Sequence, residues 1–300
     1  MYLYLRLFFV QFKGDKMITA DKLFQGVFKD RSFLSKMLKI ALPVMIQNFI
    51  SSFLNMIDTV MVGRLGETEI AAVGIANQYF FFFNMILIGI CGGCSVFISQ
   101  FWGKRDMPNI KRILGVGMIS VIVVAAMFIV AGYLCPKGII TLFNKDYLVV
   151  GLGSGYLRIV LVSYLFTGIT FLYSFSLRAV GNAFQPMIIS FAALVCNAVF
   201  NYILIFGKLG APAMGVKGAA VATVIARVLE AVLLSLAVYI KKSVLAASLR
   251  ELTDYGFSFI IKSYKTILPV ILNDICWGLA TLVYAAVYGR MGTQSVAVIQ

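Results

Sequence analysis

The sequence predicts an all-α integral membrane protein, and three observations support this prediction. First, 61% of the 300 residues are hydrophobic and only 13% are charged, whereas soluble domains carry about 25% charged residues. Second, the charges are segregated and leave apolar blocks of about 20 residues, which is the length of a helix that crosses a bilayer. Third, one of these blocks recurs near the C-terminal end of the chain, which indicates an internal repeat.

The two copies of the repeat share the spacing of their prolines and glycines. The first copy runs from Pro43 to Gly66 and the second from Pro269 to Gly292, and each ends in Gly-Arg-apolar-Gly. About six spans separate the two prolines, so both copies enter the membrane from the same side, as in the parallel repeats of secondary transporters. A complete unit would then have about twelve spans, of which this chain holds about seven. We therefore expect a truncated chain.

The predicted spans follow one another with short connections. They cover residues 40–62, 70–101, 113–133, 157–177, 186–206, 216–239 and 266–288, and an eighth begins at Val296. Between the third and fourth spans we expect an outer loop at 135–155 with a short interfacial helix at 139–143. The chain is thus divided into an N-terminal cytoplasmic segment, a six-helix N-lobe, a cytoplasmic linker and the start of a repeated C-lobe, at residues 1–39, 40–240, 241–265 and 266–300.

The chain has a net charge of +14, and the excess of Lys and Arg lies in the loops. The basic residues gather in the N-terminal segment, in the loop at 103–112, at Arg178 and in the linker. Cytoplasmic loops carry such an excess, so we expect a cytoplasmic N-terminus and no nucleic-acid partner.

Several function classes lack the residues that they need. The chain contains no histidine, which excludes His-based metal sites, Ser-His catalysis and His proton relays. There is no P-loop pattern, so we expect no ATP hydrolysis and no ATPase partner. No nucleophile stands beside a base, so we do not expect an enzyme. The Cys91-Gly-Gly-Cys94 motif lies in an apolar span and indicates close helix packing through small residues.

The first span carries a polar stripe that includes an acid. Gln47, Ser51, Asn55 and Asp58 recur at helical spacing and share one face. A charged Asp at the centre of such a helix costs about 2.5–3.5 kcal/mol, so this face should meet a bundle interior or a wet cavity. The alternative is that Asp58 lies hydrated near the outer interface, where it only caps the helix or forms a hydrogen bond with Asn55.

Two other spans carry polar residues on one face each. Asn197 and Asn201 stand at i and i+4. In the sixth span Thr223, Arg227 and Glu230 share a face, and the last two can pair at i and i+3 as a neutral structural unit. In the second span Asn77, Gln78 and Asn84 are candidates for lining a cavity.

At this point the sequence resembles the multidrug and toxic compound extrusion (MATE) family. The order and spacing of several short motifs carry the resemblance from about Phe33 onward: Asp58-Thr-Val-Met-Val-Gly63, Ala71-Ala-Val-Gly, Ser99-Gln-Phe-Trp-Gly103, Arg178-Ala-Val-Gly-Asn182, Asn197-x-x-x-Asn201, Gly215-Val-Lys-Gly-Ala-Ala-Val-Ala-Thr223 and Leu268-Pro-Val-Ile-Leu-Asn-Asp274 with Trp277.

The resemblance implies a fold and a function. It implies a bundle of two six-helix lobes that rock about a central cavity. It also implies cation-coupled antiport that exports cationic or amphiphilic drugs in exchange for Na⁺ or H⁺. We therefore expect a small-molecule substrate and the lipid bilayer of a bacterial inner membrane as partners, with no cofactor other than the coupling ion.

The resemblance also implies site residues. The coupling residues would be Asp58, Asn55, Asn197, Asn201 and Thr223, with Na⁺ possible at Asp58, Asn197 and Asn201. Some family members have a second acid where this chain has Asn201, which leaves the preferred ion open. In the second lobe Asp274 after Asn273 is a further candidate acid. The residues expected to line the cavity are Gln47, Ser51, Asn77, Gln78, Trp277 and Tyr284.

Two rival functions remain at this point. A lipid-linked oligosaccharide flippase shares the two-lobe fold, but few Arg or Lys lie inside the spans to bind a pyrophosphate headgroup. A seven-span receptor or a membrane enzyme fits the number of spans, but the parallel repeat with its second copy cut short argues against it.

Overall fold

The computed structural model describes the backbone of residues 31–290 and the side chains of most residues from 34 to 280. This range is mainly helical and contains no strand, which confirms the all-α prediction. The helices are α3 (Arg31–Gly63), α4 (Glu67–Gly103), α5 (Met107–Leu134), α6 (Pro136–Thr141), α7 (Tyr147–Val160), α8 (Val162–Ala179), α9 (Phe184–Phe206), α10 (Val216–Ile240), α11 (Leu249–Thr253) and α12 (Phe257–Arg290).

Within the described residues, five helices are long and apolar enough to cross a membrane, and α7 with α8 makes a sixth span that is bent by 50°. The six correspond to the predicted N-lobe spans. α12 occupies the range of the predicted seventh span and also takes in the last residues of the expected linker. The eighth span lies outside the described residues.

The expectation of an outer loop at 135–155 is wrong, because most of that segment is helical. α6 matches the short interfacial helix, but α7 already begins at Tyr147. Asp146 starts this helix, since its side chain accepts a hydrogen bond of 2.8 Å from the backbone of Leu148. The closely spaced glycines at 151, 153 and 155 suggested a loop, but glycines also allow membrane helices to pack closely.

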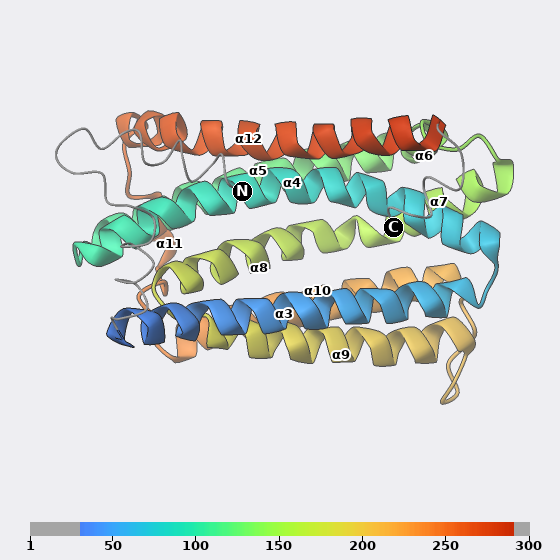
Figure 1. Cartoon of the computed structure of the whole chain (residues 1–300), viewed down its shortest axis with the longest axis horizontal. Coiled ribbons are helices and arrows are strands. Elements are labelled where there is room, and N and C mark those ends of the chain that lie inside the picture. The colour runs from blue at the N-terminus through green and yellow to red at the C-terminus, as the bar shows by residue number, and fades with distance from the viewer. Residues whose placement is uncertain (1–30, 291–300) are drawn as a thin grey trace.

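The helices form two groups with α8 between them (Figure 1). α12 lies along α4, which also packs against α5, while α3, α9 and α10 form the opposite group. α3 packs mainly on α9 and turns large apolar side chains such as Phe49 (74% exposed) away from the bundle. Gln47 and Asp58 of its polar stripe face α9, where they form hydrogen bonds with Ser190 and Asn201.

Aromatic side chains fill the contact of α4 with α5 and α8. The rings of Phe83 and Tyr164 are both buried and stack with their centroids 4.6 Å apart. The Tyr79 hydroxyl donates a hydrogen bond of 2.8 Å to the backbone carbonyl of Phe128. Apolar burial and aromatic stacking thus stabilise the α4–α5–α8 contact.

Glycines bring α4 close to α12. A Cβ at Gly89 would lie 2.6 Å from the Cα of Ile271, and one at Gly93 would lie 3.0 Å from the Cα of Ile267. Cys91 and Cys94 are buried free thiols in the same segment. The small residues around this motif therefore pack helices together, as the sequence predicted.

The segment between α10 and α12 is held against the start of α5. Lys111 and Arg112 form ion pairs with Glu251 (2.7 Å) and Asp254 (2.9 Å). A Cβ at Gly115 would collide with the backbone oxygen of Leu252, so only glycine permits this approach. The linker is therefore docked on the N-lobe.

Candidate functional site

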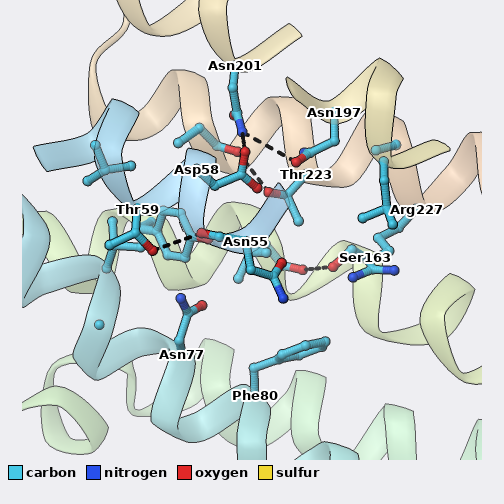
Figure 2. Close-up of a pocket in the computed structure, with 18 of the residues that line it drawn as sticks. Asn55, Asp58, Thr59, Asn77, Phe80, Ser163, Asn197, Asn201, Thr223 and Arg227 are labelled. Carbon is cyan, nitrogen blue, oxygen red and sulfur yellow. Dashed lines mark hydrogen bonds between the residues drawn. The ribbon is translucent and has the colours of Figure 1, made fainter. Parts of the chain in front are cut away.

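A cavity of about 430 Å³ lies among α3, α4, α7, α8, α9 and α10 (Figure 2). Every one of these helices contributes polar side chains to its wall. The polar lining residues are Asn55, Asp58, Thr59, Asn77, Asn84, Tyr156, Ser163, Asn197, Asn201, Thr223, Arg227 and Glu230. A polar cavity inside an apolar bundle is typical of a functional site.

Asp58 is held by an amide from another helix. Asn201 Nδ2 donates a hydrogen bond of 2.8 Å to Asp58 Oδ1 and a weaker one of 3.3 Å to Asn197 Oδ1 (Figure 2). Asn55, in contrast, uses its backbone carbonyl to accept a bond from Thr59. The partner of Asp58 is therefore a distant residue of α9 and not its neighbour on α3.

The oxygens around Asp58 are of the kind that hold a hard cation or a proton. Asn201 is only 2% exposed, and its Oδ1 atom has no hydrogen-bond partner among the described residues. Asn84 Oδ1, across the cavity on α4, also lacks one. Carboxylate and amide oxygens are ligands for such cations. The described residues contain no cluster of three or more Cys, Asp or Glu side chains that could hold a metal.

A second polar group lines the same cavity. Arg227 Nη1 donates a bond of 2.9 Å to Glu230 Oε2, which confirms the predicted pairing. Glu230 Oε1 accepts a bond of 2.7 Å from Ser190, which in turn accepts one of 2.9 Å from Gln47. Arg178 donates to Gln47 at 2.7 Å. This chain of contacts, which we call the inner network, ties α3, α8, α9 and α10 together.

The structure brings together the predicted coupling residues. Asp58, Asn55, Asn197, Asn201 and Thr223 all line the cavity, and so does Asn77.

Other predicted residues lie elsewhere. Gln47 belongs to the inner network, while Ser51 and Gln78 are not among the lining residues. On α12, Trp277 is 62% exposed, and neither it nor the candidate acid Asp274 with its neighbour Asn273 lines this cavity. The side chain of Tyr284 lies outside the described residues.

Sequence reasoning missed several lining and network residues. Tyr156 and Ser163 flank the break between α7 and α8, and Tyr156 fell between the expected loop and the predicted fourth span. Ser190 is a small hydroxyl in an apolar span and carries no sequence signal. Its role depends on the two residues that it joins, which come from different helices.

Known proteins resemble this chain in sequence. The MatE family model matches residues 43–203, which is more than half of the chain. The probable multidrug resistance protein NorM of Thermotoga maritima is 28% identical over 241 residues, which cover 76% of this chain and 51% of the relative. The probable multidrug resistance protein YoeA of Bacillus subtilis is 29% identical over 201 residues, which cover 67% and 43%. The chain spans about half the length of these curated relatives.

Solved structures of transporters have a similar fold. A MOP superfamily transporter from Pyrococcus furiosus has a TM-score of 0.78 at 22% identity, with 88% of this chain and 58% of that chain covered. An outward-facing multidrug resistance MATE family transporter has a TM-score of 0.74 at 22% identity, with 82% and 54% covered. The matches are to transporters, in agreement with the expectation that the chain is not an enzyme. By the family model, supported by these relatives, the chain belongs to the MatE family.

Proposed function

We propose that this chain is the N-lobe and the start of the C-lobe of a cation-coupled antiporter that exports cationic or amphiphilic drugs from a bacterial cell. The observation that carries the proposal is the Asp58–Asn201 pair inside a polar cavity of the bundle. The names of the relatives, which are multidrug resistance proteins, supply the substrate class.

The coupling step would take place at Asp58. A carboxylate in a cavity walled by apolar helices is costly while it is charged, and a bound Na⁺ or proton neutralises it. Further oxygens at the same cavity come from Asn197, Asn201, Asn55 and Thr223. Ion binding would therefore stabilise the conformation in which these oxygens converge on the ion.

Alternating access would follow because the bound ion stabilises one conformation more than the other. A ligand shifts a conformational equilibrium only by its differential affinity for the two states. One coupled charge that crosses 100 mV supplies about 2.3 kcal/mol. The N-terminus would face the cytoplasm, because the basic residues gather on that side, and two lobes would rock about the space between them.

The test is efflux of ethidium from cells that express the full-length gene. Na⁺ and proton gradients are imposed separately, and the wild type is compared with Asp58→Asn at equal membrane abundance. Export by the wild type alone supports the proposal, and the gradient that drives it identifies the ion. Undiminished export by Asp58→Asn contradicts it. If neither protein exports the dye under either gradient, drug export fails as a proposal and a lipid-linked substrate is tested next.

A further inference from the structure

The charge inside the cavity comes from three side chains of the described residues. Asp58 and Glu230 are acids and Arg227 is a base, and the other lining residues are neutral. Glu230 is 4% exposed and uses both oxygens, one toward Arg227 and one toward Ser190. The bond from Arg227 is charge-assisted, so the two side chains form an ion pair with no net charge. With Asp58 ionised, the cavity therefore carries one net negative charge.

Arg227 is held by Glu230 through one of its nitrogens, and other N–H groups of its guanidinium remain available to the cavity. Its hydrogen bond to Glu230 goes through one nitrogen, Nη1, and its side chain remains 28% exposed. The guanidinium lies in the cavity wall (Figure 2) and interacts electrostatically with Asp58. An arginine has five N–H donors, so several of them are left for the cavity.

The inner network positions Arg227 through the carboxylate of Glu230. Ser190 holds Glu230, Gln47 holds Ser190, and Arg178 holds Gln47. The guanidinium of Arg178 also lies 5.6 Å from the ring centre of Phe175. Four helices thus fix the Glu230 carboxylate, which makes the Arg227–Glu230 pair a built part of the cavity.

We propose that Arg227 is a specificity-determining residue: held by Glu230, it keeps the cavity at one net negative charge and so restricts the ligand to a single monovalent cation, inorganic or organic. The proposal rests on the proposed function, since it assumes that cations bind at Asp58. A divalent cation such as Ca²⁺ would leave one positive charge uncompensated in the cavity, next to a guanidinium that repels it. Ca²⁺ also requires about 6–8 oxygen ligands, whereas of the two carboxylates that line this cavity Glu230 already forms an ion pair with Arg227.

The first test needs no variant. The full-length protein in lipid nanodiscs is loaded with radioactive Na⁺, which is then displaced by unlabelled Na⁺, by ethidium and by Ca²⁺. Ca²⁺ should displace the label no better than Na⁺ does. Tighter displacement by Ca²⁺ overturns the proposal.

The second test is charge complementation. Glu230→Gln preserves the shape of the side chain but brings the net charge to zero, so Na⁺ affinity should fall by about tenfold or more although Asp58 is intact, which corresponds to about 1.4 kcal/mol. Arg227→Gln combined with Glu230→Gln returns the net charge to one negative, and Na⁺ affinity should recover. Wild-type affinity in Glu230→Gln, or no recovery in the double variant, overturns the proposal.

Asp58→Asn separates this proposal from the one on which it rests. Loss of Na⁺ binding in Asp58→Asn together with unchanged binding in Glu230→Gln means that the coupling site is correct and the role of Arg227 is wrong. Full Na⁺ binding in Asp58→Asn means that the proposed function itself has failed.

Discussion

Asn201 donates a hydrogen bond of 2.8 Å to Asp58, 143 positions earlier in the chain. Gln47 and Ser190 form a second contact between α3 and α9 with the same separation of 143. An equal separation means that the two helices run in the same direction, as the first and fifth spans of a bundle must. The two contacts are about three helical turns apart, which returns the same faces to each other. α3 is therefore joined to α9 at two points, at Asp58 and at Gln47.

The Asp58–Asn201 contact should contribute to both stability and ion binding. Asn201→Ala removes the amide donor of Asp58 and leaves a carboxylate in the cavity without it, which should lower the free energy of unfolding by about 1–3 kcal/mol. The amide oxygen that we assign to the ion is lost as well, so stabilisation by added Na⁺ should shrink. Thermal unfolding with and without Na⁺ measures both effects. The control is Asn48→Ala on the exposed face of α3, and an equal effect of the two changes would contradict the prediction.

The inner network should depend on Ser190, although its side chain is small. Ser190→Ala removes the bonds to Gln47 and to Glu230 together, so we expect a loss of about 1–3 kcal/mol, because buried polar groups lose partners. Ser52→Ala on the exposed side of α3 is the matched control. Chemical denaturation compares the two variants, and a Ser190→Ala protein as stable as the control would show that the network does not fasten α3.

The α4–α12 contact should respond differently to two nearby glycines. A Cβ at Gly89 would lie 2.6 Å from the Cα of Ile271, whereas one at Gly92 meets only a side-chain atom of Val270 at 3.9 Å. Gly89→Ala should therefore force α12 away from α4 at a cost of about 1–3 kcal/mol, while Gly92→Ala should be tolerated. Melting temperatures of the two purified variants check this. Equal temperatures would mean that the helices do not approach each other as closely as described.

The docked linker should be sensitive to acid. The bond from Lys111, together with the backbone bond from Ser248, lowers the pKa of Glu251 from its ordinary value of 4.5 to about 2. A lowered pKa in the folded state stabilises the contact fully above pH 4.5, and this stabilisation is lost as the pH falls toward 2. Distances between spin labels on α5 and α11 should therefore widen over this range.

The control for the acid response is Glu251→Gln, which cannot change its charge. In this variant the distances between the labels should stay constant as the pH falls from 4.5 toward 2. They should already be wider than in the wild type at neutral pH. An unchanged acid response in Glu251→Gln would assign it to another group, such as Asp254 in the neighbouring ion pair.

The sequence was most informative about the helices. Each span is visible because hydropathy is a local property, and the backbone of a membrane-crossing segment must satisfy its hydrogen bonds within the helix. The prediction was wrong where local signals conflicted, at residues 147–155, where glycines and a polar start suggested a loop. Periodicity also placed Asn197 beside Asn201 and Arg227 beside Glu230, because both pairs lie on a single helix.

Contacts between helices could not be predicted in the same way. The sequence pointed to Asp58 as a buried acid, but it did not say that Asn201 would hold it and Asn55 would not. Ser190 joins the stripe of α3 to Glu230 without any signal in its own neighbourhood.

By itself, then, the sequence determined the all-α membrane class, the helical ranges and the acid on the first span, since these follow from composition and from periodicity within one segment. The tertiary structure alone decided which polar faces meet, that Arg227 and Asp58 share one cavity, and that α3 is fastened twice to α9. The physical reason is that the register of two packed helices depends on the shapes of both surfaces, including the glycines that let them approach, and no single segment contains that information.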